Sequence, residues 1–248
     1  MRDQKSKIKI IENKSEIGAG TRGSSLGIDA LKVASLKSNS SYFFRYKSIV
    51  LENYNHLLFE QVKFPKAKRI EKVIDVFNIV ANEVSSQLLK NNFPIILSGD
   101  HSSAGGTIAG IKKAYPGKRL GVVWIDAHAD LHSPYTSPTG NLHGMSLATA
   151  LNSNNEKHRV QEIDSATNEL WDKLKSVGNI SPKINARDLV YVGLRSTEEP
   201  EDYFISNNEI KNINVETIRR NGAESAANDI LDYLSKCDII YISFDVDS

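Results

Sequence analysis

Apolar positions along the chain follow two different spacings. Residues 70–89 carry apolar side chains at intervals of three and four, which is typical of a helix with one buried face. Residues 104–114, 168–177 and 223–234 have similar spacing. The first of these three stretches is followed by Pro-Gly at 116–117, a common stop signal for a helix. We therefore predict four helices at these positions.

Short apolar runs lie between the predicted helices. They cover residues 93–97, 120–125, 189–192 and 239–244, and the second of them is rich in β-branched side chains. Strands that alternate with helices indicate an α/β fold, in which a parallel sheet is covered by helices on both faces. We find no internal repeat and no low-complexity linker, so nothing in the pattern divides residues 1–248 into separate domains.

Polar side chains follow directly after these predicted strands. If the strands are parallel, their carboxyl ends meet at one edge of the sheet, where α/β proteins bind their ligands. The sequence therefore predicts a polar site at this edge. The candidate residues, in chain order, are Asp100, His101, Asp126, His128, Asp130, Arg195, Asp245 and Asp247.

Six of these side chains have the chemistry of a metal centre. Asp126, His128 and Asp130 alternate with two alanines, so in extended chain they face one side with room for close approach. Asp245 and Asp247 repeat this spacing on another strand, and His101 adds a second imidazole. Carboxylates with some imidazole suit manganese or a similar divalent ion. Six ligands exceed the needs of one catalytic metal with an open position and suit a pair of metals.

Each element alone has a simpler explanation. An isolated Asp-x-Asp after a strand is usually a solvated turn, and a lone histidine such as His101 is more often a hydrogen-bonded structural residue. Asp126-x-His128-x-Asp130 directly after a buried strand is harder to explain in this way. The combination of all three elements at strand ends therefore favours a two-metal site.

Composition excludes several classes of protein. The formal net charge of +1 gives no global attraction to nucleic acid or to an anionic membrane. The single cysteine, Cys237, excludes an internal disulfide and cysteine-based zinc sites, and fits a reducing compartment. The N-terminus has no secretory signal pattern, and the apolar runs are too short to span a bilayer. We predict a cytoplasmic protein.

Residues 18–23 match the pattern G-x-G-x-x-G, which in dinucleotide-binding proteins follows a strand. Residues 8–11 could form such a strand, but residues 13–16 intervene before the glycines. No acidic residue stands at a second strand end about 20 residues further on. We interpret the segment as a glycine-rich turn that opens a helix.

Four motifs resemble those of the ureohydrolases, the family of arginases, agmatinases and formimidoylglutamases. They are Ser-Gly-Asp-His-Ser at 98–102, Trp-Ile-Asp-Ala-His-Ala-Asp at 124–130, Gly-Asn-Leu-His-Gly-Met at 140–145 and Ser-Phe-Asp-Val-Asp at 243–247. The resemblance extends from about residue 18 to residue 247. It implies a three-layer α/β/α sandwich with a parallel sheet, formed by residues 1–248 as a single domain.

The resemblance also implies roles for individual residues. Asp126 and Asp245 would bridge two manganese ions, Asp130 would also accept a hydrogen bond from the attacking group, and His143 would be a proton shuttle. One ion would take His101, Asp126, Asp130 and Asp245, and the other Asp126, His128, Asp245 and Asp247.

Within the family, the loop at 131–143 is most similar to that of arginases, which hydrolyse L-arginine to L-ornithine and urea. Thr139 and Asn141 match positions that hold the substrate α-carboxylate. His132 stands where many arginases have asparagine, and Glu198 where an aspartate contacts the α-amino group. These departures leave agmatine, or another guanidino or formimino compound, as an alternative substrate.

Family members continue beyond the position that matches Asp247, so we expect this chain to be truncated at its C-terminus. Residues 239–247 are expected to form an interior strand buried on both faces. A chain that ends there is expected to be unstable and to have little activity. The alternative of another class is an inactive domain that binds metal or partner subunits. The resemblance further implies a homo-oligomer, a trimer or hexamer, with a small-molecule substrate and no nucleic-acid or membrane partner.

Overall fold

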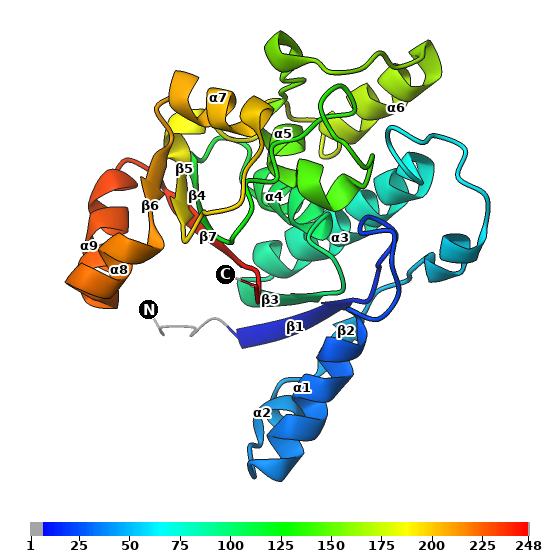
Figure 1. The fold of residues 1–248 in the computed structure, drawn as a ribbon. Coiled ribbons are helices and arrows are strands. Elements are labelled where there is room, and N and C mark those ends of the chain that lie inside the picture. Colours follow the sequence, from blue (N-terminus) through cyan, green and yellow to red (C-terminus); the bar gives the residue numbers. More distant parts are fainter. Residues whose placement is uncertain (1–6, 248) are drawn as a thin grey trace.

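The computed structural model describes residues 7–247, and every strand pairing within them is parallel. The strands form two sheets, one with the order β2-β1-β3 and one with the order β6-β5-β4-β7 (Figure 1). The strands are β1 (Lys7–Asn13), β2 (Ser48–Val50), β3 (Asn92–Ser98), β4 (Leu120–Ile125), β5 (Leu189–Val192), β6 (Lys211–Ile213) and β7 (Ile239–Phe244).

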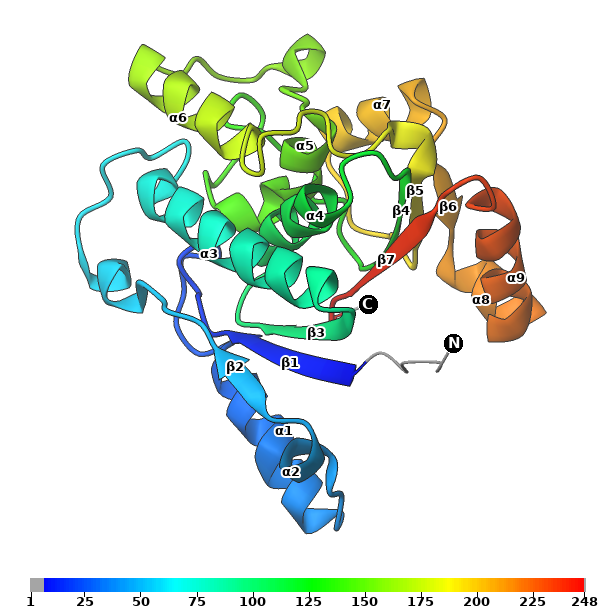
Figure 2. The ribbon, with the colours of Figure 1, turned by 180° about the vertical axis from the view of Figure 1, so that it is seen from behind.

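Helices connect the strands and pack against both faces of the four-stranded sheet. The long helix α3 and its neighbour α4 pack closely against each other on one side of the sheets (Figure 2). The helices are α1 (Leu26–Lys37), α2 (Tyr42–Arg45), α3 (Ile70–Leu89), α4 (Ser103–Ala114), α5 (Ser146–Leu151), α6 (Ser165–Lys175), α7 (Glu199–Asn207), α8 (Val215–Asn221) and α9 (Ala223–Tyr233).

One large apolar core joins the two sheets. It combines Ile11 of β1, Val76 of α3, Ile108 of α4 and Val122 of β4, all of which are almost fully buried. A smaller core, which includes Val190 of β5, lies on the opposite face of the four-stranded sheet against α8 and α9. Helices α1 and α2 extend from the three-stranded sheet (Figure 1). The predicted α/β sandwich is confirmed, with its parallel strands divided between two sheets.

Strand β7 departs from its predicted environment. It pairs with β4 on one side and ends the four-stranded sheet. Its residues on the α8–α9 face, Ile240, Ile242 and Phe244, are 37%, 61% and 66% exposed. Within the described residues β7 is therefore an edge strand with an exposed apolar face, whereas the sequence pattern predicts an interior strand buried on both faces. Within residues 7–247, none of the helices is both long and apolar enough to cross a membrane.

Lys183 is an unusual member of the interior. Only 4% of it is exposed, and its ammonium group donates a hydrogen bond to the backbone carbonyl of Lys175. Burial lowers the pKa of Lys183 from its ordinary value of 10.5 to about 8. The folded chain therefore holds a charge at neutral pH that would be better solvated in the unfolded chain.

Replacing Lys183 by methionine tests the free-energy cost of burying this charge, because that cost depends on pH. Between about pH 8 and 10.5 the unfolded chain binds more protons than the folded chain, so native stability rises with pH through this window. At pH 7, relief of desolvation should raise the free energy of unfolding of Lys183→Met by up to about 3 kcal/mol. Loss of the hydrogen bond should lower it by about 1–3 kcal/mol. Urea unfolding measures the free energy of unfolding of both chains, and the stability of the variant relative to the unchanged chain should fall between pH 7 and pH 10. A pH-independent difference would contradict the assignment.

Candidate metal centre

The six predicted metal ligands all lie beyond the carboxyl ends of three strands. His101 follows β3 in the three-stranded sheet, whereas Asp126 and Asp245 follow β4 and β7 in the other sheet. Register explains the proximity of the last two, since β4 and β7 pair from Leu120–Ile239 to Ile125–Phe244. The structure thus brings side chains from both sheets to one place.

The first group of donors surrounds the imidazole of His101. Its Nδ1 lies 3.0 Å from Oδ2 of Asp126, 3.0 Å from Oδ2 of Asp130 and 3.2 Å from Oδ2 of Asp245. Potential ligand atoms of His101, Asp126 and Asp130 all lie within 4.8 Å of one another.

The second group of donors surrounds His128. Its Nδ1 lies 3.3 Å from Oδ1 of Asp126 and 3.4 Å from Oδ2 of Asp247. The two groups therefore share Asp126, which turns one carboxylate oxygen toward each histidine. This arrangement is suited to a carboxylate that bridges two cations.

Two buried atoms test whether a cation fits the first group. Nδ1 of His101 and Oδ2 of Asp130 have no hydrogen-bond partner in the described part of the chain, although only 3.0 Å separates them. Buried polar atoms without partners are costly, and a bound cation would satisfy both. The donor set, rich in carboxylate with some imidazole, also fits a divalent ion such as manganese.

Electrostatics points to the same fit. Burial raises the pKa of Asp130, and nearby Asp126 raises it further. The pKa of Asp247 is also raised, by burial and by its neighbours Asp245 and Asp126. Burial opposes protonation of His101, but the surrounding carboxylates raise its pKa well above the usual value. These carboxylates repel one another, and positive charge placed among them relieves that repulsion.

Neighbouring side chains hold His101 and Asp126 in orientation. The indole Nε1 of Trp124 donates to Oδ2 of Asp126 at 3.1 Å, and the indole ring stacks on His101 with centroids 4.2 Å apart. Nε2 of His101 lies 2.8 Å from the hydroxyl of Ser243. That contact leaves Nδ1 to face the carboxylates. The orienting roles of Trp124 and Ser243 were not part of the sequence prediction.

Glu201 is a second residue that the sequence analysis missed. Its carboxylate is buried and accepts a hydrogen bond at 3.1 Å from the backbone N–H of Leu131, the residue that follows Asp130. Burial raises the pKa of Glu201 to about 7. Glu201 also forms a capping box with Glu198 at the start of α7. The spacing Glu198-x-x-Glu201 before a helix was the available signal.

His143 lies beside this centre without belonging to either donor group. It is part of the short 3₁₀ helix η2 (Leu142–Met145), its side chain is exposed, and its backbone N–H donates to the carbonyl of Gly18 at 3.2 Å. A Cβ added to the next residue, Gly144, would lie 4.0 Å from Oδ1 of Asp130. His143 also acts electrostatically on the carboxylate of Asp130 and lowers its pKa, so the two side chains lie near each other.

The predicted substrate contacts fall into two pairs. His132 is mostly buried, and its Nε2 lies 3.6 Å from a carboxylate oxygen of Glu198 and 3.6 Å from one of Glu201. Burial lowers the pKa of His132. Thr139 and Asn141 form the other pair, in which the hydroxyl of Thr139 accepts from the backbone N–H of Asn141 at 3.1 Å.

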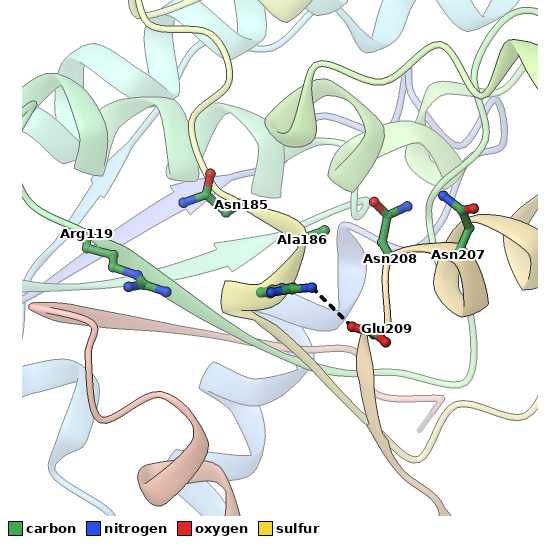
Figure 3. Close-up of a pocket in the computed structure, with 7 residues that line it drawn as sticks. Arg119, Asn185, Ala186, Asn207, Asn208 and Glu209 are labelled. Carbon is green, nitrogen blue, oxygen red and sulfur yellow. Dashed lines mark hydrogen bonds and ion pairs between the residues drawn. The ribbon is translucent and has the colours of Figure 1, made fainter.

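A separate depression of about 490 Å³ lies at the opposite, amino-terminal ends of the strands (Figure 3). Arg119 and Glu209, which line it, come directly before β4 and close to the start of β6. Arg119 is paired with Asp188, and Glu209 with Arg187. Because these charges are already matched, the depression has less to offer a charged ligand than the metal centre.

Comparison with known proteins gives consistent matches. A family model described as the arginase family matches residues 7–248. An arginase of Bacillus subtilis (strain 168) is 31% identical over 243 residues, which are 97% of this chain and 75% of the relative. Among solved structures, an arginase from Bacillus cereus has a TM-score of 0.76 at 30% identity, covering 97% of this chain and 74% of that one. An Entamoeba histolytica arginase in complex with L-ornithine has a TM-score of 0.77 at 27% identity, covering 97% and 76%.

Proposed function

The chain belongs to the arginase family, a family of hydrolases that act on C–N bonds, and we propose that it hydrolyses L-arginine to L-ornithine and urea with two manganese ions. The observation that carries the proposal is the pair of donor groups that share Asp126. The relatives described above support the substrate, since they are named arginases and one of them was crystallised with L-ornithine.

We assign six ligands to the two ions. Asp126 and Asp245 would bridge, Asp130 and His101 would complete one coordination sphere, and His128 and Asp247 the other. A pair of divalent ions supplies, when bound, Lewis-acid activation of water at neutral pH.

The chain's own residues would then handle protons and orientation. Asp130, beside its role as a ligand, would accept a hydrogen bond from the attacking water and so orient it. The water oxygen would add to the guanidinium carbon and lose a proton, and the bond to the departing nitrogen would break when the tetrahedral adduct collapses. His143 would return a proton to that nitrogen as a general acid, a role suited to an exposed imidazole near neutral pH.

Substrate selection would rest on the two pairs described above. Glu198, beside a His132 whose lowered pKa favours the neutral imidazole, offers carboxylate oxygens to an α-ammonium group. Thr139 and Asn141 offer hydroxyl and amide donors to an α-carboxylate. We also propose that the protein is a cytoplasmic homo-oligomer, for which the single cysteine and the family resemblance are the support.

The sharing of Asp126 predicts unequal losses of metal. Asp126→Asn should remove most of both ions, because each donor group loses a charged ligand, whereas Asp247→Asn should remove mainly one. Elemental analysis of manganese-loaded, desalted protein measures this, with about two ions expected in the unchanged chain. Asp229→Asn, an exposed carboxylate on α9, is the matched control. Equal losses in the two ligand variants would contradict the bridging role.

Removal of the His143 imidazole should affect turnover rather than metal content. His143→Ala should lower kcat by about 100- to 10,000-fold, the usual contribution of a general acid or base, while elemental analysis shows unchanged manganese. Urea release gives the rate. Loss of metal in this variant would instead identify His143 as a ligand.

Substrate preference tests the proposed zwitterion contacts. A site that hydrogen-bonds an α-carboxylate strongly rejects an analogue that leaves its donors unpaired, by as much as about 10⁴-fold. Agmatine is arginine without that carboxylate, so kcat/KM for arginine should greatly exceed that for agmatine. The double variant Thr139→Ala/Asn141→Ala should reduce the preference by impairing arginine alone. Comparable values for the two substrates in the unchanged chain would favour an agmatinase.

A further inference from the structure

The carboxylate of Asp100 is buried beside the metal centre, yet it belongs to neither donor group. Its Oδ2 accepts hydrogen bonds from the backbone N–H groups of Gly18 at 2.9 Å and Ala19 at 3.3 Å. Its Oδ1 accepts from the backbone N–H of Ser102 at 2.8 Å and from the hydroxyl of Ser102. Asp100 thus binds a segment that lies 81–82 residues earlier in the chain.

Gly18 connects Asp100 to His143 through a second hydrogen bond. The carbonyl of Gly18 accepts the hydrogen bond from the backbone N–H of His143 at 3.2 Å. The approach requires glycine, because a Cβ at Gly18 would lie 2.4 Å from the hydroxyl oxygen of Ser102 and 2.9 Å from Oδ1 of Asp100. A continuous path of contacts therefore runs from Asp100 through Gly18 to the backbone of His143.

The other side of His143 is also held. The hydroxyl of Ser146 lies 2.8 Å from the carbonyl oxygen of His101 and 3.1 Å from that of His143, and its one proton is shared between these two acceptors. The backbone of His143 is thus fixed between the glycine-rich segment and the turn that carries His101, while its side chain stays exposed. The position of the imidazole depends on both attachments.

The same segment explains the G-x-G-x-x-G pattern at 18–23. Its backbone N–H groups bind the chain's own carboxylates: those of Gly18 and Ala19 bind Asp100, and that of Gly23 binds Glu16 at 2.8 Å. A Cβ at Gly20 would lie 2.9 Å from Oδ1 of Asn141, so this glycine also permits a close approach at the site. The glycines therefore allow the backbone to approach carboxylates and the site closely. In a dinucleotide-binding turn, by contrast, the backbone N–H groups bind phosphates.

We propose that Asp100 is a positioning residue for catalysis, which acts through Gly18 to hold His143 where it protonates the leaving amine. The inference rests on the proposed function, because it assumes that His143 is the general acid. Asp100 itself would touch no substrate, and its effect on the reaction would be transmitted through the hydrogen bonds that Gly18 forms with Asp100 and with His143.

Asp100→Asn is the direct test. Asparagine has nearly the same shape but only one accepting oxygen, so it cannot receive all the donors that Asp100 binds. A small displacement of a catalytic group costs up to about 100-fold in rate. We expect kcat for arginine to fall by about 10- to 100-fold, with KM changed by less than about threefold and manganese content unchanged. Loss of manganese would overturn the inference, since Asp100 would then act through its neighbour His101.

A double-mutant cycle distinguishes positioning from a general loss of structure. If Asp100 acts through His143, Asp100→Asn should change kcat by less than about twofold in a His143→Ala background. Independent effects that multiply would overturn the inference while leaving the proposed function intact. If His143→Ala alone has no effect on kcat, the proposed role of His143 fails, and this inference fails with it.

Hydrogen–deuterium exchange gives a readout that does not depend on activity. The amides of Gly18, Ala19 and His143 should exchange faster in Asp100→Asn, and unchanged exchange at His143 would overturn the proposal. If Asp100→Asn does not fold, Ser102→Ala removes one donor to the same carboxylate and should shift kcat and exchange in the same direction, by less. Asp164→Asn weakens a comparable carboxylate bond to the amide of Thr167 at the start of α6, and should leave kcat unchanged.

Discussion

The mutual repulsion of neighbouring carboxylates is the main physical constraint on this structure. Asp126, Asp130, Asp245 and Asp247 converge from two strand ends onto a region where Asp126 and Asp130 have almost no access to solvent. Burial of like charges is costly, and two imidazoles offset only part of that cost. Contacts such as those of Trp124 to Asp126 hold these groups together, so that a cation finds its ligands already assembled.

Much of the strand framework could be predicted because buried parallel strands have continuous apolar runs. The predicted limits of β4, β5 and β7 agree with the structure, and α3 was found from its regular spacing. Strands β2 and β6 have only three residues each and carry no comparable signal. The division into two sheets depends on pairing between distant segments, which local patterns do not encode.

The candidate site divides in a similar way. The donors next to strand ends could be identified because they follow buried apolar runs at every second position of the sequence, as at Asp126 and His128. The residues that orient them could not, since their roles arise from contacts between distant positions, such as His101 with Ser243 and Leu131 with Glu201. The glycine-rich segment shows the limit of a short motif. Its glycines are required by close approach of backbone to Asp100, a reason that the pattern alone does not reveal.

The placement of His101 after β3 has a mechanical consequence. The remaining donors follow strands of the other sheet, and within residues 7–247 no strand pairing joins the two sheets. An ion held by both His101 and Asp126 would therefore link a segment that follows one sheet to a segment that follows the other, in addition to the apolar core that the two sheets share. A chelator would take away this link as well as the catalytic ions, so the temperature at which the protein unfolds would depend on the metal supply.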